Sequence, residues 1–382
     1  MGGIGLPQGA WERYSEGLRD MKRILMVTYS LDSGGLERVV VNLANGLDPR
    51  SYEAYVCCIA RGGSLASSLS RSDMLFIIGN EGRINYRSCR DLYRLMRRLS
   101  IDVVHTHNTA GLLYAFAPAK LSRTPIIHTN HGFVFTEREH RVVEFVEALF
   151  SRRVDRYVCV SEHLKLHVAR TCRLRDASVA VVYNGIKLPD PPASLPARDG
   201  RGIVIGSVGN LRAIKNYQLL ISAFAEIVRR YPGCRLELVG EGEERERLAR
   251  LAATLGVDGG VQFVGQAADP YVYLKGFDIF VLPSLSEGIS MSVLEALAMK
   301  RICLASNVGG NPEIIRDGVN GFLFESNDVK QLISKLDELI RNLDDPSLNR
   351  VREMGRATVE QRFSLDAMVG SYGMLYDAVA TA

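Results

Sequence analysis

The sequence predicts an α/β protein built from two doubly wound, Rossmann-like domains that face each other across a cleft. Three observations predict this fold class. The 382 residues are enough for two domains at roughly 150 residues each. Short runs rich in valine and isoleucine alternate with longer helical stretches, which is typical of buried parallel strands followed by helices. One proline-rich segment interrupts this rhythm near the middle of the chain.

Apolar runs on both sides of this interruption are expected to form the strands. Those before it are residues 24–29, 55–60, 75–78, 103–107, 125–130, 156–160 and 179–183. Those after it are residues 203–208, 235–239, 261–265, 278–283, 301–306 and 321–324. Open α/β sheets bind ligands beyond the carboxyl ends of their strands, so we expect the functional site in the cleft between the two sheets.

The interruption also divides the chain. We expect an extension at residues 1–20, an N-terminal domain at 21–187, a linker at 188–200, a C-terminal domain at 201–360 and a last helical segment at 361–382.

Composition excludes several classes of protein. Hydrophobic residues make up 47% and charged residues 24%, which rules out collagen-like, disordered and disulfide-scaffold chains. The net charge of +4 does not indicate a nucleic-acid binder, so no nucleic-acid partner is expected. The charge is uneven, since residues 1–200 carry 27 basic and 20 acidic side chains and the remainder 20 and 23.

Cysteine usage and hydropathy indicate the compartment. The 7 cysteines are odd in number and scattered, several within apolar runs, which is typical of reduced, buried thiols. The chain start lacks a signal-peptide core, and no apolar run approaches the ~18 residues that span a bilayer. We therefore expect a cytoplasmic protein.

A glycine pair, Gly34 and Gly35, lies between the first predicted strand and a helical pattern. Glycines at such a turn let backbone N–H groups approach an anion at the helix N-terminus, although they are often no more than the turn itself. The pattern is not Gly-x-Gly-x-x-Gly, and the chain has no Gly-Lys-Ser/Thr loop. A dinucleotide-dependent dehydrogenase and a P-loop nucleotidase are therefore disfavoured.

All 7 histidines lie between positions 105 and 167, so a zinc site has to be considered. The pairs at 105/107 and 128/131 lie on or just after predicted strands, and His163 and His167 lack an obvious third ligand. We expect no metal site and mostly structural histidines. His131 is the exception, because it follows the carboxyl end of a strand and faces the cleft.

In the second domain, the loop after the first strand contains two glycines, Arg212 and Lys215 ahead of a predicted helix at 217–229. Cations at a helix N-terminus suit a diphosphate, with lysine acting as a point charge and arginine as a fork. The alternative is a solvated loop whose charges are incidental.

The loop and helix that follow the fourth predicted strand of this domain are the most informative. Glu287 lies in the loop, and the free N–H groups near Ser290, Met291 and Ser292 can hold a phosphate without a metal. Glu295 lies one turn further along the helix. The alternatives are that Glu295 forms a capping box with Ser292 and that Glu287 is a solvated loop acid.

Together these motifs resemble the retaining glycosyltransferases of family 4, which have the GT-B architecture. The resemblance extends from Met21 to the end of the chain. Glu287 and Glu295, with seven residues between them, have the spacing typical of that family. Other segments that resemble the family are Gly34-Gly35, 102–107, 128–132, 160–162, 183–185, 307–315 and 317–321.

The resemblance implies transfer of a sugar from a nucleotide diphosphate sugar to a hydroxyl acceptor, with retention of configuration and without metal or cofactor. It also implies that the domain at 21–187 binds the acceptor, that the domain at 201–360 binds the nucleotide sugar, and that the last helix crosses back onto the first domain. The implied roles are diphosphate binding for Gly34, Gly35, Arg212, Lys215, Ser290, Met291 and Ser292, ribose binding for Glu295, contact with the donor hexose for Glu287, contact with the reacting sugar for His131, and a border with the base for Val264.

One position departs from the family pattern. The family usually has an arginine directly after the glycine that Gly209 represents, whereas this chain has Asn210. Arg212 is the candidate replacement. The departure leaves a GT-B-like nucleotide-sugar binding protein without transferase activity as one alternative. A nucleotide-sugar epimerase is another, and a phosphorylase is disfavoured because no distinctive pyridoxal phosphate lysine motif is present.

Arginines in the N-terminal domain bear on the acceptor and its location. They recur at 83, 87, 90, 94, 97 and 98, and a second cluster lies at 152, 153 and 156. These arginines either form a solvated basic face or contact the anionic inner surface of the cytoplasmic membrane. The second interpretation predicts a lipid-linked acceptor and a peripheral enzyme of cell-surface polysaccharide or glycolipid synthesis.

Overall fold

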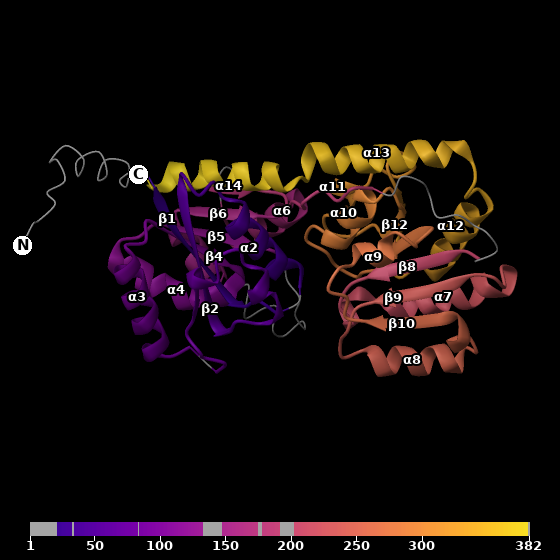
Figure 1. Cartoon of the computed structure of the whole chain (residues 1–382), viewed down its shortest axis with the longest axis horizontal. Coiled ribbons are helices and arrows are strands. Elements are labelled where there is room, and N and C mark those ends of the chain that lie inside the picture. The colour runs from indigo at the N-terminus through magenta and orange to yellow at the C-terminus, as the bar shows by residue number, and fades with distance from the viewer. Residues whose placement is uncertain are drawn as a thin grey trace, which may run out of the picture.

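A computed structural model describes residues 21–32, 34–82, 84–132, 147–174, 178–191 and 202–380. Two parallel sheets organise these residues (Figure 1), which confirms the predicted fold class. The predicted extension, most of the linker and Arg83 lie outside the described residues.

The N-terminal sheet has 7 strands in the order β3-β2-β1-β4-β5-β6-β7. Their bounds are β1 Lys22–Ser30, β2 Tyr52–Arg61, β3 Leu75–Ile77, β4 Val103–His107, β5 Ile126–Asn130, β6 Arg156–Cys159 and β7 Val179–Val181. The α-helices are α2 Gly35–Gly46, α3 Tyr86–Leu99, α4 Asn108–Ser122 and α6 Glu162–Thr171, and the short 3₁₀ turns are Ser64–Ser68, Ser72–Met74 and Ser151–Arg153.

The C-terminal sheet has 6 strands in the order β10-β9-β8-β11-β12-β13. Their bounds are β8 Val204–Val208, β9 Arg235–Val239, β10 Val261–Gly265, β11 Ile279–Leu282, β12 Ile302–Ser306 and β13 Phe322–Phe324. The helices are α7 Tyr217–Arg230, α8 Arg245–Thr254, α9 Tyr271–Leu274, α10 Met291–Ala298, α11 Asn311–Ile314, α12 Val329–Arg341, α13 Pro346–Arg362 and α14 Leu365–Ala380, with 3₁₀ turns η5 Ala213–Lys215 and η6 Asp258–Gly260.

Side chains of β1 point alternately to the two faces of the sheet, so this strand packs against helices on both faces. Leu25 and Val27 face a core that also contains buried side chains of α3 and α4, whereas Ile24 and Met26 face α2 and α14. Successive side chains of a strand point to opposite faces of the sheet. All four are fully buried, which is why this strand reads as an unbroken apolar run.

Helix α14 returns to the N-terminal domain after α13 has covered the C-terminal one (Figure 1). The chain crosses at Ser364, which forms a parallel bridge with Ile186. Lys22 Nζ lies 2.6 Å from Asp377 Oδ1, and the Tyr52 hydroxyl donates to the Gly373 carbonyl at 3.2 Å. The last helix is therefore part of the N-terminal core. Within the part of the chain that the structure describes, no helix has the length and hydropathy needed to cross a bilayer.

Candidate active site

Lys215 and Glu287 meet at the carboxyl edge of the C-terminal sheet. Lys215 ends η5, which follows β8, and Glu287 lies in the loop between β11 and α10. Lys215 Nζ is 2.6 Å from Glu287 Oε1, and the Ser284 hydroxyl donates to the same oxygen at 2.6 Å. The Glu287 side chain is only 10% exposed, so it is not the solvated loop acid that the sequence left open.

Gly309 and Gly310 pack directly against the backbone of the Glu287 loop. Gly309 has φ of +54°, which favours glycine, and a Cβ there would collide with the Glu287 carbonyl. A Cβ at Gly310 would collide with the Gly288 carbonyl in the same way. The Gly310 amide donates to the Glu287 carbonyl at 3.3 Å. Two side-chain-free residues thus let the loop pack directly against the segment after β12.

Helix α10 begins directly after this loop. Its N-cap is Ser290, whose hydroxyl accepts from the Val293 amide at 3.4 Å and lies 3.2 Å from the Ser292 hydroxyl. The first N–H groups of a helix have no intrahelical partner, so those at Met291 and Ser292 remain available to an anion. The capping box between Ser292 and Glu295 is not formed, because the helix starts two residues earlier than that alternative requires.

Glu295 instead pairs with a side chain of the other domain. Arg38 Nη1, from the first turns of α2, lies 2.8 Å from Glu295 Oε1, and Glu295 is only 4% exposed. Burial raises the pKa of Glu295 to about 7, against the opposing effect of the Arg38 guanidinium. This buried ion pair joins the domains at the position that the sequence analysis assigned to the ribose.

His131 follows β5 and faces the same loop from the N-terminal domain. Its amide donates to Asn108 Oδ1 at 2.8 Å, and its Nε2 lies 3.0 Å from His107 Nδ1. A Cβ at Gly288 would lie 2.5 Å from the His131 carbonyl oxygen, so the two domains touch here. Burial, and then the neighbouring His128, lower the pKa of His131 to about 3, which keeps the ring neutral at physiological pH.

A column of buried hydrogen-bonding side chains supports His131. The His107 ring lies against His105, with ring centroids 4.1 Å apart and the rings tilted by 38°. His105 Nδ1 lies 2.7 Å from the Tyr376 hydroxyl of α14, and its Nε2 lies 2.8 Å from Thr129 Oγ1. These contacts agree with the expectation that most of the histidines are structural.

The predicted glycine turn meets α10. Gly34 is the N-cap of α2, and a Cβ on Gly35 would lie 3.5 Å from Met291 Cγ. A Cβ on Gly34 would collide with Glu37 Oε2, so the Glu37 carboxylate lies directly over this glycine. The structure therefore brings the two predicted diphosphate-binding turns together, and it adds a carboxylate that the sequence analysis did not single out.

Two predicted residues lie further out. Arg212 is exposed at the start of η5, and its charge reaches Glu37 across the cleft. Val264 is half buried on the edge strand β10, and β9 and β8 separate it from β11. Asn210 follows β8 and is half buried. The roles of Arg212 and Val264, like those of the other predicted site residues, stay predictions.

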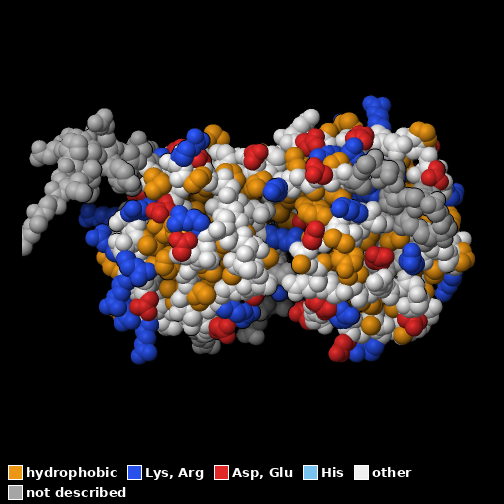
Figure 2. Space-filling view, in the orientation of Figure 1, with side chains coloured by type: hydrophobic (Ala, Val, Ile, Leu, Met, Phe, Trp, Pro, Cys, Tyr) orange, Lys and Arg blue, Asp and Glu red, His pale blue; other side chains and the backbone are white. Residues whose placement is uncertain are grey.

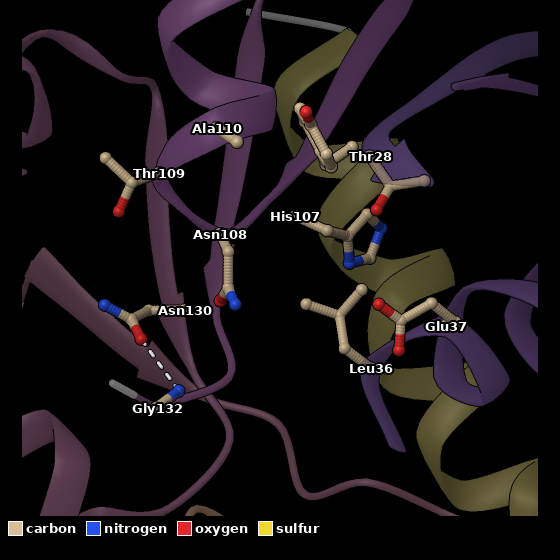
Figure 3. Close-up of a pocket in the computed structure, with 10 residues that line it drawn as sticks. Thr28, Leu36, Glu37, His107, Asn108, Thr109, Ala110, Asn130 and Gly132 are labelled. Carbon is tan, nitrogen blue, oxygen red and sulfur yellow. Dashed lines mark hydrogen bonds between the residues drawn. The ribbon is translucent and has the colours of Figure 1, made fainter. Parts of the chain in front are cut away.

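A pocket opens on the N-terminal side of the cleft (Figure 3). It has a volume of about 170 Å³ and lies at the carboxyl ends of β1, β4 and β5 beside the first turn of α2. Its lining residues are Thr28, Tyr29, Leu36, Glu37, His107, Asn108, Thr109, Ala110, Asn130 and Gly132. Among the described residues, no group of three or more histidine, cysteine, aspartate or glutamate side chains is arranged to hold a metal ion.

With this geometry in place, comparison with known proteins identifies the family. Residues 33–189 match the family described as Glycosyltransferase Family 4, and residues 195–358 match Glycosyl transferases group 1. The chain belongs to the GT4-type glycosyltransferases. The predicted family is thereby confirmed, and the matched ranges contain all of the predicted site residues.

Two relatives and one solved structure illustrate the likeness of this glycosyltransferase to known proteins. It is 26% identical to the UDP-Gal:alpha-D-GlcNAc-diphosphoundecaprenol alpha-1,3-galactosyltransferase of Escherichia coli, over 90% of this chain and 93% of that protein. It is 28% identical to the lipopolysaccharide core biosynthesis glycosyltransferase LpsE of Rhizobium meliloti, over 89% and 94%. Anabaena Alr3699/HepE, solved with UDP and glucose, superposes with a TM-score of 0.80 at 19% identity, over 94% of this chain and 100% of that one.

Proposed function

We propose that this glycosyltransferase moves a sugar from a nucleotide diphosphate sugar to a hydroxyl acceptor, with retention of configuration and without a metal ion. The observation that carries the proposal is the meeting of Lys215, the α10 N-terminus and the Gly35 turn at one place between the domains. Cationic and backbone N–H donors gathered in this way suit a diphosphate. The UDP and glucose named with the Anabaena structure agree with such a donor.

Charge development explains what these groups would do in the reaction. Breaking the bond between the sugar and the diphosphate places negative charge on the leaving oxygen. A preorganised donor aimed at such an oxygen is worth ~3 kcal/mol. Lys215, Arg212 and the amides at the start of α10 are the candidate donors, and no divalent ion is needed in this scheme.

The surroundings of Glu287 support a role in holding the donor hexose. Lys215 and Ser284 both bond to Glu287 Oε1 and so fix the orientation of the carboxylate, which suits hydrogen bonding to a sugar hydroxyl. In this proposal the acceptor attacks from the face that the diphosphate leaves, and a phosphate oxygen takes the acceptor's proton. His131 contacts the reacting sugar, Glu295 the ribose and Val264 the base in this proposal.

The surface of α3 supports a lipid-linked acceptor at an anionic membrane. Its inner face buries Leu92, Leu95 and Met96, so the arginines project from the other side. Arg87, Arg94, Arg97 and Arg98 are exposed, and basic side chains gather at the end of the N-terminal domain where α3 lies (Figure 2). Each basic residue near an anionic leaflet contributes ~1 kcal/mol. The names of the two relatives point in the same direction, towards cell-surface glycoconjugate synthesis.

A thermal-shift panel of UDP-, GDP- and ADP-sugars tests the donor. The cognate donor at 100 times its Kd is expected to stabilise the protein by ~2.7 kcal/mol. Product formation from that donor should persist in EDTA. Binding without turnover on any hydroxyl acceptor would favour the non-catalytic alternative that Asn210 raises, and interconversion of the donor sugar without acceptor would favour an epimerase. Complete loss of activity in EDTA would contradict the metal-free scheme.

Sedimentation with lipid vesicles tests the membrane contact. Binding is expected to increase with the fraction of anionic lipid and to fall in Arg94→Glu/Arg97→Glu. The matched control is Arg316→Glu, which changes an exposed arginine of the C-terminal domain. Vesicle binding that does not change with the anionic lipid content, or that falls equally in the control, would contradict the proposed membrane contact.

A further inference from the structure

The N-terminal domain contains a buried carboxylate, that of Glu147, which lies among three hydrogen-bonding side chains. Glu147 is 0% exposed. The Thr109 hydroxyl donates to its Oε1 at 2.5 Å, and the Tyr157 hydroxyl donates to its Oε2 at 2.8 Å. His128 Nε2 lies 3.2 Å from the same Oε2. Burial of a charge is costly unless the charge is paired and hydrogen-bonded, so these partners explain how a carboxylate persists here.

One hydrogen-bonded route leads from Glu147 through α4 to His131. Thr109 is the second residue of α4 and follows Asn108 (Figure 3). Asn108 Oδ1 accepts a hydrogen bond from the His131 amide at 2.8 Å. The bond from Thr109 to the carboxylate therefore fixes the turn whose neighbouring side chain holds the His131 backbone.

A second route leads from the carboxylate through β6 to the residue after His131. The Tyr157 hydroxyl accepts from Asn130 Nδ2 at 3.1 Å. Asn130 Oδ1 in turn accepts from the Gly132 amide at 2.9 Å (Figure 3). The two routes thus end on the backbone N–H groups of His131 and Gly132. This backbone touches the other domain, since a Cβ at Gly288 would lie 2.5 Å from the His131 carbonyl oxygen.

Ionisation of Glu147 fixes the direction of the hydrogen bonds in both routes. Burial opposes this ionisation, but His128 and the two hydroxyl donors outweigh that effect and lower the pKa of Glu147. An ionised carboxylate only accepts hydrogen bonds, so the hydroxyls of Thr109 and Tyr157 both donate to it. The Tyr157 oxygen is then left to accept from Asn130. A glutamine at position 147 would present a donor to one of the two hydroxyls and would break one route.

We propose that Glu147 is a positioning residue of the transfer reaction, and that its carboxylate holds the backbone on both sides of His131 in the place from which this ring contacts the reacting sugar. The inference deepens the proposed function and rests on the role proposed there for His131. Glu147 acts through its hydrogen-bonded partners. A misplacement of reacting groups by about 1 Å can cost roughly 10²-fold in rate, so a small shift of this backbone is enough to slow transfer.

Steady-state kinetics of the full-length chain, with the donor that the thermal-shift panel selects, test this inference. In Glu147→Gln, kcat is expected to fall roughly 10- to 100-fold. The KM for the donor should change little, because most of the proposed donor-binding groups belong to the C-terminal domain. Tyr157→Phe cuts only the second route and should lower kcat less. Because both residues act on one backbone segment, the combined loss in the double variant should be smaller than the product of the single losses.

The control is Val56→Ala, which opens a cavity at a fully buried side chain of β2. Strands β1 and β4 separate β2 from β5, so this variant should lose Tm and keep kcat. All variants are assayed at a temperature at which circular dichroism shows them to be folded.

NMR of the chain labelled with ¹⁵N-histidine separates positioning from a loss of stability. The amide signal of His131 is identified among those of the 7 histidines by its absence in His131→Gln. This signal should shift in Glu147→Gln and Tyr157→Phe and should stay in place in Val56→Ala.

Unchanged kcat in Glu147→Gln, an equal loss of kcat in Val56→Ala, or a His131 amide signal that does not move would overturn the inference. If Glu147→Gln does not fold, Tyr157→Phe decides by the same two measurements. Failure of the proposed function would appear separately, as an absence of nucleotide-sugar binding in the thermal-shift panel or as full activity of His131→Gln.

Discussion

Removing Arg38 should destabilise the protein in a way that depends on pH, because its partner Glu295 is buried and titrates near neutrality. The pKa of Glu295 is raised by burial from its ordinary 4.5 to about 7. The stability that the protonated carboxyl contributes is therefore fully present below pH 4.5 and lost as the pH rises to about 7. At 1.36 kcal/mol per unit, this loss is on the order of 3 kcal/mol.

In Arg38→Met, Glu295 loses the guanidinium that partly offsets the effect of burial on its pKa. The pKa of Glu295 should therefore rise further in this variant. Breaking a buried ion pair costs ~3–5 kcal/mol. The Arg38 side chain is 28% exposed, and Glu295 can escape the penalty by taking a proton, so we expect a smaller loss of about 2 kcal/mol at pH 8.5. That loss corresponds to a fall in Tm of roughly 4–8 °C for a domain of this size.

The assay is thermal unfolding of four proteins at pH 5.5, 7 and 8.5: wild type, Arg38→Met, Glu295→Gln and the double variant. At pH 5.5 Glu295 is largely protonated, and wild type and Arg38→Met should differ little. The difference in Tm between wild type and Arg38→Met should grow above pH 7. The difference in Tm between Glu295→Gln and the double variant should not grow with pH. An equal loss of Tm at all three pH values, or growth that persists in the double variant, would refute the reasoning.

Three further predictions concern the candidate active site and its support. Lys215→Ala should lower kcat ~10²–10³-fold with unchanged circular dichroism, because it removes a preorganised donor; unchanged product formation would contradict that role. Tyr376→Phe leaves buried His105 without a partner at Nδ1 and should cost ~1–3 kcal/mol in thermal unfolding, together with a fall in kcat; an unchanged Tm would argue against the column. Gly309→Ala should displace the loop before α10 and reduce turnover more than it reduces Tm, whereas full activity would show that the loop tolerates a Cβ.

Much of the fold could be predicted from the sequence because parallel strands are buried on both faces. The run predicted at 103–107 coincides with β4, and its five residues are all buried. Strand ends were harder to predict. Strand β2 begins at Tyr52, three residues before the predicted run, because its half-buried first residues pair with the start of β1 at Lys22. Backbone pairing continues where the hydropathy pattern has already stopped.

The site could be predicted only as far as the local motifs extend. Lys215 and Glu287 come together because each follows a neighbouring strand of one sheet. Arg38 was missed because its partner is 257 positions away, and no local spacing encodes a contact made by domain docking. The available signal was the position of Arg38 in the sequence, since Glu37 and Arg38 follow the Gly34-Gly35 pair after a single residue, Leu36.

The first turn of α2 links the donor and acceptor halves of the site. Gly35 faces Met291 of α10, Glu37 lines the pocket of the N-terminal domain, and Arg38 pairs with Glu295. Since Arg38 belongs to α2 and Glu295 to α10, any movement that draws α2 away from α10 breaks their ion pair and exposes the Glu295 carboxylate, whereas the pocket moves with α2 because its lining lies wholly in the N-terminal domain.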